Sequence, residues 1–175
     1  VKLIRDKKIY LIEDVCESHG AKLGKNKVGT FGEISNFSFY YGHHMTTIEG
    51  GMISTNSREI DRLAKMKRGH GLLRDSQDKL FIKKISLKYK DLNNDFIFCT
   101  SGFNLRNTEL AAVIGIEQLK RLNQNIKIRN QNHNIFLKFL RDDLFFKNFN
   151  LNGASNYGLH LILKKKDKEL FKKVL

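Results

Sequence analysis

The longest helical pattern in the chain begins at Asn107 or Thr108, and it limits the possible folds more than any other feature. Apolar residues recur with the spacing of one helix face: Leu110, Ala111, Val113, Ile114, Ile116, Leu119 and Leu122. After a predicted break at residues 123–125 the pattern resumes through Leu140. A pattern of this length is typical of a spine between two parts of a larger molecule. We therefore expect this helix to join two parts of a larger molecule.

Short apolar runs separated by glycines precede this helix. Residues 9–12 form a partly β-branched run that stops at Glu13 and Asp14, which predicts a buried strand with carboxylates at its carboxyl end. Residues 35–40 and 51–55 are further strand candidates. These signals indicate an α/β fold, and ligands of open α/β sheets gather at the carboxyl ends of the strands.

Two helices and one strand complete the expected elements. Ser57 is predicted to cap a helix that ends near Lys67, because its apolar residues lie on one face and its charges on the other. Residues 158–163 are predicted to form a strand, and a last helix is predicted to begin at Asp167. No internal repeat or low-complexity linker interrupts the chain.

The chain is strongly basic, with 32 Lys and Arg against 18 Asp and Glu and a formal net charge of +14. Such a charge requires a nucleic-acid role to be considered. The lysines are spread through the chain, however, without the interleaved aromatic residues of an RNA-binding sheet. A basic surface also suits small anionic ligands, and a lysine-rich genome would give the same composition. We therefore expect no nucleic-acid partner.

The cysteines and the apolar runs indicate a compartment. Cys16 and Cys99 are too far apart for a zinc spacing and do not form a disulfide framework, which favours a reducing cytoplasm. No apolar run approaches the ~20 residues of a membrane span, and the first residues lack the apolar core of a signal peptide. We expect Val1 not to be a natural start, because no initiator methionine precedes it.

Asp14 and Glu17 are the first candidates for chemistry. Asp14 follows the predicted strand, where a carboxylate can pair with a protonated ring nitrogen of a ligand. The alternative is that Asp14 caps the next turn and Glu17 belongs to a solvated face. Ser38, at the end of the next predicted strand, has a hydroxyl that can donate to a phosphate, although packing alone would also account for it.

Adjacent histidines at 43 and 44 leave three interpretations open. They can be one core imidazole and one structural contact. A metal site with Glu49 or His70 is the second interpretation, but the spacing of these residues does not support it, and no metal is expected. In the third, His43 moves protons near neutral pH. Asn104 precedes the long helix in the run Ser101 to Ala112, which is at least a helix start.

Three of these segments, residues 13–21, 38–51 and 101–112, resemble the signatures of the DegT/DnrJ/EryC1/StrS family of sugar aminotransferases, which use pyridoxal phosphate. The resemblance spans residues 9–122 in the order of the family. It implies that residues 1–148 are part of the large domain of an aspartate aminotransferase-like α/β enzyme of fold type I, and that residues 149–175 are the start of the small carboxyl-terminal domain. Members of the family are longer, so the resemblance leads us to expect a fragment that is inactive alone.

The resemblance implies a role for each candidate residue. Asp14 takes the position that pairs with the ring nitrogen of the cofactor, and Glu17 the position, usually Gln, that contacts the ring hydroxyl. Ser38 takes the phosphate-binding position. Asn104 takes the position that reaches the cofactor phosphate of the other subunit, which implies a homodimer. His43 stands where a lysine usually forms a Schiff base, and an imidazole has no primary amine with which to form one.

A His-His pair followed by an aliphatic residue and Thr-Thr is similar to the subgroup of nucleotide-sugar 3-dehydratases, of the GDP-4-keto-6-deoxy-D-mannose 3-dehydratase type. That similarity implies loss of the C3 hydroxyl from a nucleotide-linked 4-keto-6-deoxy sugar in dideoxysugar and O-antigen synthesis. It also implies the pyridoxal and pyridoxamine forms of the cofactor, glutamate as amino donor and His43 as base. The alternatives are a sugar aminotransferase or an inactive relative, and a basic nucleic-acid-binding module.

Overall fold

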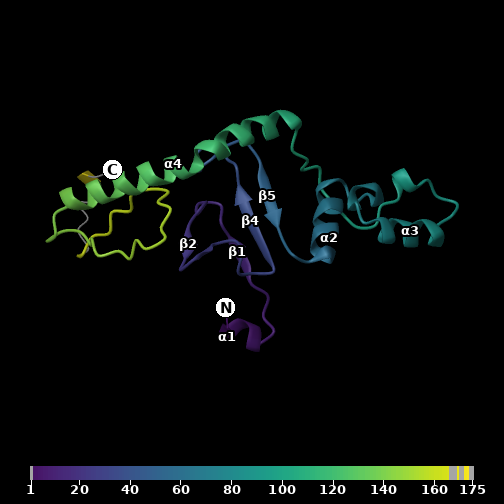
Figure 1. The fold of residues 1–175 in the computed structure, drawn as a ribbon, viewed down its shortest axis with the longest axis horizontal. Helices are drawn as coiled ribbons and strands as arrows, with labels where there is room; N and C mark the ends of the chain where they lie inside the picture. Colours follow the sequence, from purple (N-terminus) through teal and green to yellow (C-terminus); the bar gives the residue numbers. More distant parts are fainter. Residues whose placement is uncertain (1, 166–168, 170–171, 174–175) are drawn as a thin grey trace.

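A computed structural model of the chain describes residues 2–165, 169 and 172–173. Its elements follow one another as α1 (Lys2–Asp6), β1 (Ile12–Asp14), β2 (Lys22–Leu23), β3 (Asn26–Lys27), β4 (Ile34–Ser38), β5 (Gly51–Ser54), α2 (Arg58–Arg68), η1 (Leu73–Ser76), α3 (Lys79–Lys88), η2 (Asn94–Phe96) and α4 (Glu109–Phe139). The arrangement is elongated, with α2 and α3 at one end and residues 140–165 at the other (Figure 1). The helix predicted from Asp167 lies outside the described residues.

A three-stranded sheet in the order β1-β4-β5 lies at the centre. β1 and β4 are parallel, with Asp14 opposite Asn36, whereas β4 and β5 are antiparallel, with Ser38 opposite Gly51. Asp14 and Ser38 therefore end neighbouring parallel strands at the same edge of the sheet. The strand β4 runs toward α4 and β5 runs away from it, so residues 39–50 lie close to α4 (Figure 1). The Asn107 amide donates to the carbonyl of Gly51 at 3.3 Å, just before α4 begins.

The prediction of a buried strand at residues 9–12 is wrong. The ladder begins only at Ile12, because Leu11 bonds to Glu33 instead. The N–H of Leu11 donates to the carboxylate of Glu33, and the backbone N–H of Glu33 donates to the carbonyl of Leu11. Tyr10 and Ile12 are 81% and 68% exposed, since no described element covers their face. The carboxylates do lie at the carboxyl end of the strand, as expected.

The strands predicted at residues 35–40 and 51–55 are confirmed as β4 and β5, and the helices predicted after Ser57 and from Asn107 or Thr108 are confirmed as α2 and α4. The Ser57 hydroxyl caps α2 by accepting from the N–H of Ile60, and the Thr108 hydroxyl caps α4 by accepting from the N–H of Ala111. The predicted break at residues 123–125 is wrong, because α4 is continuous; asparagine costs a helix only a few tenths of a kcal/mol relative to alanine. The strand predicted at residues 158–163 is reduced to a single bridge between Phe145 and Leu163.

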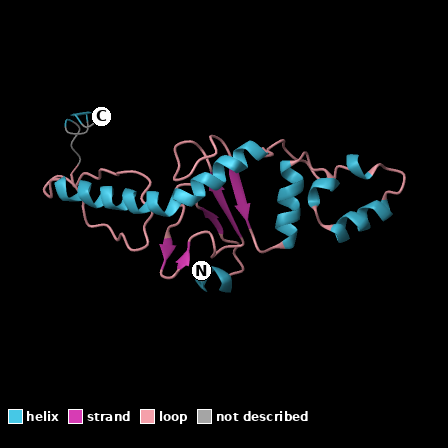
Figure 2. Cartoon of the chain, turned by 45° about the horizontal axis from the view of Figure 1, so that its top comes forward, coloured by secondary structure: helices cyan, strands magenta, loops and turns pink. Residues whose placement is uncertain are grey.

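Two groups of buried side chains anchor this fold. One lies on α2, around η1 and just after η2, where η1 contacts α2, α3 and η2; its members are Met66, Leu72, Leu73 and Ile97. The other follows the ends of β1 and β4 and includes Val15 and Met45 beside buried polar residues. The second half of α4 lies against residues 141–160 (Figure 2). The second buried group is the one that positions the candidate site.

Candidate active site

The carboxylate of Glu13 fixes the loop that supports the end of β1. It accepts three backbone hydrogen bonds, from Gly29 at 2.6 Å and from Phe31 and Gly32 at 2.7 Å each. Partial burial works to raise the pKa of Glu13, but the three N–H groups together hold it below its ordinary value. Gly29 has a φ of +90°, and a Cβ there would meet the Phe37 ring, so a glycine is needed for this turn.

Asp14 is exposed at the end of β1 and is held from one side. Its Oδ1 accepts from the backbone N–H of Cys16 at 3.1 Å and from the Asn36 amide at 3.0 Å. The thiol and then the N–H of Cys16, with a smaller effect of Asn36 and His43, hold the pKa of Asp14 below its ordinary value. An exposed carboxylate that stays anionic in this way can accept a hydrogen bond from a cationic partner.

His43 lies in the loop that follows β4, and its ring is placed by contacts on two sides. Its Nε2 is 3.9 Å from Oε1 of Glu17, an ion pair when the imidazole is protonated. Its Nδ1 is buried and meets no hydrogen-bond partner among the described residues. The rings of Tyr40 and Tyr157 approach it edge-on, each with centroids 5.5 Å away. His43 is therefore fixed in orientation, with Nε2 toward an exposed carboxylate.

Ser38 is the last residue of β4 and is half-buried. Its Oγ accepts from the backbone N–H of Tyr40 at 3.2 Å, which leaves the hydroxyl proton able to donate outward. The backbone N–H of Phe39 donates to the carbonyl of Gly50, so the pairing of β4 with β5 extends past Ser38 before the chain turns toward His43. Ser38 and Asp14 thus present polar groups at one edge of the sheet.

Two further histidines, at positions 19 and 44, are buried behind this edge. His19 is 4% exposed and His44 is 3% exposed, and neither ring nitrogen of either has a hydrogen-bond partner among the described residues. Their ring centroids are 5.8 Å apart. Burial first, and then the neighbouring imidazoles of His44 and His43, lower the pKa of His19 to about 4. Both imidazoles are therefore neutral near pH 7, because burial and then Arg129 also lower the pKa of His44.

Residues 154–157, which are distant from the other site residues in the sequence, close one side of the site. The Ser155 hydroxyl donates to the carbonyl of His19 at 2.6 Å, across 136 positions of sequence. The Asn130 amide on α4 donates to Ala154, and its oxygen accepts from the backbone and side chain of Asn156. Arg129 donates to the carbonyl of Tyr157 at 2.8 Å. These bonds hold the Tyr157 ring against His43.

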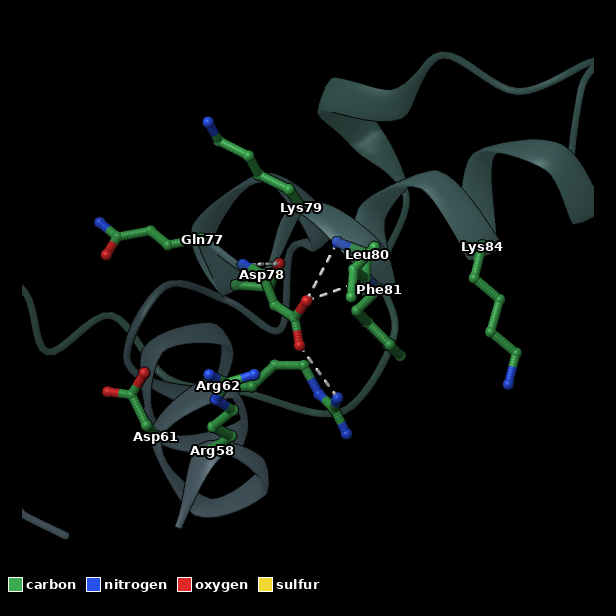
Figure 3. Close-up of a pocket in the computed structure, with 10 residues that line it drawn as sticks. Arg58, Asp61, Arg62, Gln77, Asp78, Lys79, Leu80, Phe81 and Lys84 are labelled. Carbon is green, nitrogen blue, oxygen red and sulfur yellow. Dashed lines mark hydrogen bonds and ion pairs between the residues drawn. The ribbon is translucent and has the colours of Figure 1, made fainter. Parts of the chain in front are cut away.

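A hollow of about 370 Å³ opens beside Glu17, between α4 and the carboxyl-terminal residues. A second hollow is a separate feature: it lies between α2 and α3, lined by charged side chains such as Arg58, Arg62 and Asp78 (Figure 3). There Arg62 pairs with Asp78 at 3.3 Å. The two hollows share no lining residue, and only the first contains a candidate residue.

Asn104 lies on a different part of the molecule, which we call the Asn104 arm (residues 67–72 and 99–106). Its backbone bridges to Gly69, while the N–H of His70 donates to Phe103 at 2.7 Å and that of Leu105 to Arg68 at 2.9 Å. A Cβ at Gly102 would collide with the backbone of residues 70 and 71, so the two strands of the arm meet only because glycine stands there.

The structure therefore brings together four of the five candidates and leaves the fifth apart. Asp14, Glu17, Ser38 and His43, which we call the strand-end cluster, lie at one sheet edge. No hydrogen bond or ion pair between described residues links Asn104 to them. Sequence reasoning gave Tyr157, His19 and His44 no role in the site. His19 stands inside the 13–21 motif, and that is the one signal that could have found it.

The described residues contain no metal-binding cluster and no membrane-spanning helix. No group of three or more His, Cys, Asp or Glu side chains is arranged to hold a metal ion. None of the helices in that part of the chain is both long and apolar enough to cross a membrane.

Solved structures resemble the whole of this fold. The chain matches the E. coli GDP-4-keto-6-deoxy-D-mannose-3-dehydratase with bound hydrated PLP at a TM-score of 0.85 and 34% identity, over 99% of this chain and 44% of that one. It matches a GDP-4-keto-6-deoxymannose-3-dehydratase with a trapped PLP-glutamate geminal diamine at a TM-score of 0.80 and 32% identity, over 99% and 46% of the two chains.

Sequence comparison gives the same result. A GDP-4-keto-6-deoxy-D-mannose 3-dehydratase of Escherichia coli O55:H7 is 37% identical over 166 residues, which are 94% of this chain and 42% of that protein. The chain thus spans less than half the length of the relatives it matches. The family model of the DegT/DnrJ/EryC1/StrS aminotransferases matches residues 1–173. The chain belongs to the DegT/DnrJ/EryC1/StrS aminotransferase family, and its fold is that of the pyridoxal phosphate-dependent members.

Proposed function

We propose that this chain contributes the cofactor site of an enzyme that removes the C3 hydroxyl from a nucleotide-linked 4-keto-6-deoxy sugar, in dideoxysugar or O-antigen synthesis. The observation that carries the proposal is the imidazole of His43, fixed at the strand-end cluster within a family of aminotransferases. The relatives whose names describe 3-dehydratases support the choice of reaction.

The residues present fit pyridoxal phosphate. Asp14 offers an exposed carboxylate with a lowered pKa for a protonated ring nitrogen, and Ser38 offers a hydroxyl to a phosphate. The buried Nδ1 of His43 has no hydrogen-bond partner among the described residues, which supports a role for this ring other than a structural hydrogen bond. When bound, the cofactor supplies a pyridine ring that withdraws electrons from the reacting carbon.

Each residue of the strand-end cluster has a distinct task in this proposal. Asp14 remains anionic and keeps the ring nitrogen protonated, and Ser38 orients the phosphate. Glu17 would contact the ring hydroxyl of the bound cofactor, and its carboxylate lies 3.9 Å from Nε2 of His43, with which it pairs when the imidazole is protonated. Nε2 of His43 takes the proton from the reacting carbon and delivers it to the departing C3 hydroxyl. Tyr40 and Tyr157, whose rings both contact that of His43, limit the access of water to it.

The remaining parts of the proposal concern the intact protein. We place residues 1–148 in the large domain and residues 149–175 at the start of the small one. Glutamate is the proposed amino donor, which agrees with a relative described with a PLP-glutamate adduct. We place the enzyme in a reducing cytoplasm, a compartment that suits two free cysteines. Asn104, apart from the cluster on its own chain, reaches the cofactor phosphate of a second subunit in a homodimer.

A His43→Lys substitution tests the cofactor site in the chain as it stands. The unmodified chain should bind added pyridoxal phosphate reversibly, and gel filtration after borohydride should remove all the absorbance of the cofactor. The His43→Lys variant should keep the cofactor after the same treatment, with a mass increase on the peptide that contains position 43. His160→Lys, an exposed histidine beside the hollow near Glu17, is the matched control.

Two outcomes would contradict the proposal. Retention of cofactor by the unmodified chain after borohydride would show that another lysine anchors it, which favours an ordinary aminotransferase. Failure of either chain to bind pyridoxal phosphate, with salt-dependent retention on DNA, would favour a nucleic-acid-binding module instead.

Mixing variants tests the homodimer. His43→Lys/Asn104→Ala should lose cofactor labelling, because each dimer then lacks the phosphate contact at both sites. Adding an excess of the His43→Ala chain, which has an intact Asn104, should restore labelling of the first chain in mixed dimers. Labelling of the double variant as strong as that of His43→Lys alone would show that Asn104 does not serve the site.

A further inference from the structure

Asn36 lies directly opposite Asp14 and contacts it in two ways. In the parallel ladder of β1 and β4 the two residues are register partners. The carbonyl of Asn36 accepts from the N–H of Val15 at 2.9 Å, which fixes the backbone just after Asp14. The side-chain amide of Asn36 donates to Oδ1 of Asp14 at 3.0 Å. Both the chain and the carboxylate at this point are therefore attached to one residue.

The position of Asn36 makes it a rigid support. It is half-buried in the central strand of the sheet, with Asp14 on one side and Ile53 of β5 on the other. Its amide nitrogen also lies 3.2 Å from Sγ of Cys16, whose own N–H donates to the same carboxylate oxygen. Asp14, Asn36 and Cys16 thus form a closed set of contacts around Oδ1, and Oδ2 remains available to accept a hydrogen bond from a bound group.

We propose that Asn36 is the positioning residue of Asp14: its amide holds the carboxylate in one orientation, so that a protonated ring nitrogen meets a preorganised acceptor. A neutral amide suits this task because it donates without competing for the proton. A carboxylate at position 36 would repel Asp14, and an apolar side chain would leave Oδ1 with the contacts of Cys16 alone. What Asp14 does with a cofactor rests on the proposed function, but the hold of Asn36 on Asp14 does not.

The test measures the pKa of Asp14 by carboxyl ¹³C NMR in the chain without cofactor. Asn36→Ala removes the donor, and Asn36→Asp keeps the shape while adding a like charge. Both should raise the pKa of Asp14, the second by more, since a carboxylate within hydrogen-bond distance disfavours ionisation of its neighbour. Ile34→Val is the matched control, because it weakens β4 without touching Asp14, and it should leave this pKa unchanged.

Affinity for pyridoxal phosphate is the second measurement. It should fall about tenfold in Asn36→Ala, the low end of what loss of a supporting hydrogen bond costs at a ligand site, and should stay the same in Ile34→Val. An unchanged pKa of Asp14 in both Asn36 variants would overturn the inference whatever the affinity. An equal loss of affinity in Ile34→Val would also overturn it, by making the effect a general one of the sheet.

The two proposals fail separately. If the unmodified chain bound no pyridoxal phosphate while the pKa of Asp14 still shifted in the Asn36 variants, the proposed function would be rejected and the hold of Asn36 on Asp14 would stand.

Discussion

Hydrogen bonds hold both the strand-end cluster and the Asn104 arm in place, but the two regions differ in how far the side chains around them are buried. Behind the cluster, His19 and His44 are less than 5% exposed, and Glu13 binds three backbone N–H groups. On the arm, Phe103 and Leu105 are 65% and 68% exposed, although backbone hydrogen bonds join them to residues 67, 68 and 70. The strand-end cluster is therefore backed by buried side chains, whereas the Asn104 arm exposes apolar side chains to solvent.

This difference in exposure indicates which part of the site one chain forms by itself and which part meets another molecule. Large apolar side chains that a well-ordered backbone holds in solvent are typical of a surface that meets another molecule. The arm therefore agrees with the proposed subunit contact of Asn104. The strand-end cluster, in contrast, should keep its geometry in the single chain, and its stability is the property that can be tested first.

Glu13→Gln should give the largest loss of stability. The amide can present only one acceptor oxygen to three N–H donors, and bonds to a charged group are worth about 1.5–3 kcal/mol. We expect the free energy of unfolding to fall by about 3 kcal/mol, measured by urea denaturation at pH 7. A loss below about 0.5 kcal/mol would contradict the role of Glu13 as the anchor of the cluster.

Acid should weaken the cluster next. The pKa of His19 is about 4 in the folded chain against an ordinary value of 6.5, so the folded state binds the proton less well than the unfolded state. The contribution of His19 to the free energy of unfolding is therefore fully present above pH 6.5. It falls as the pH drops toward 4, by about 2 kcal/mol between pH 7 and pH 5.

Urea midpoints across this range for the unmodified chain, His19→Gln and the exposed control His160→Gln measure the acid effect. Only His19→Gln should flatten the curve. An equally flat curve for the control would assign the pH dependence to another group.

Asn130→Ala should have a smaller effect that reaches His43. It removes three hydrogen bonds to Ala154 and Asn156, which we expect to cost about 1.5 kcal/mol. The Tyr157 ring should then leave His43, so the ring proton shifts of His43 should move toward solvent values in NMR spectra. Asn132→Ala, exposed on the same helix, is the control. Unmoved His43 resonances in Asn130→Ala would show that residues 154–157 do not orient the imidazole.

Asp75→Asn should give the smallest effect and completes the comparison with Glu13→Gln. Asp75 pairs with Arg106 of the arm at 2.9 Å, but both side chains are partly exposed. Ion pairs of this kind are worth about 1 kcal/mol or less, and the free energy of unfolding should fall by no more than that. A loss equal to that of Glu13→Gln would mean that the arm is as firmly built as the cluster.

Local signals account for what could be predicted. The caps at Ser57 and Thr108 depend on a side chain and an N–H three residues away, so the sequence alone predicted the first and narrowed the second to Asn107 or Thr108. The strand at residues 9–12 was misplaced because the apolar pattern could not show that Glu33 would take the hydrogen bonds of Leu11. The break in the long helix was misplaced because two asparagines, at positions 123 and 125, weaken a helix too little to end it.

The sequence by itself determined the family and supplied the candidate site residues, because motif spacing and residue chemistry are properties of short segments. Only the tertiary structure decided which of those groups meet. Tyr157 reaches His43, Ser155 reaches His19 and Asn36 reaches Asp14 across 22 to 136 positions of chain. A contact between distant residues depends on the folded backbone and leaves no periodic trace in either segment.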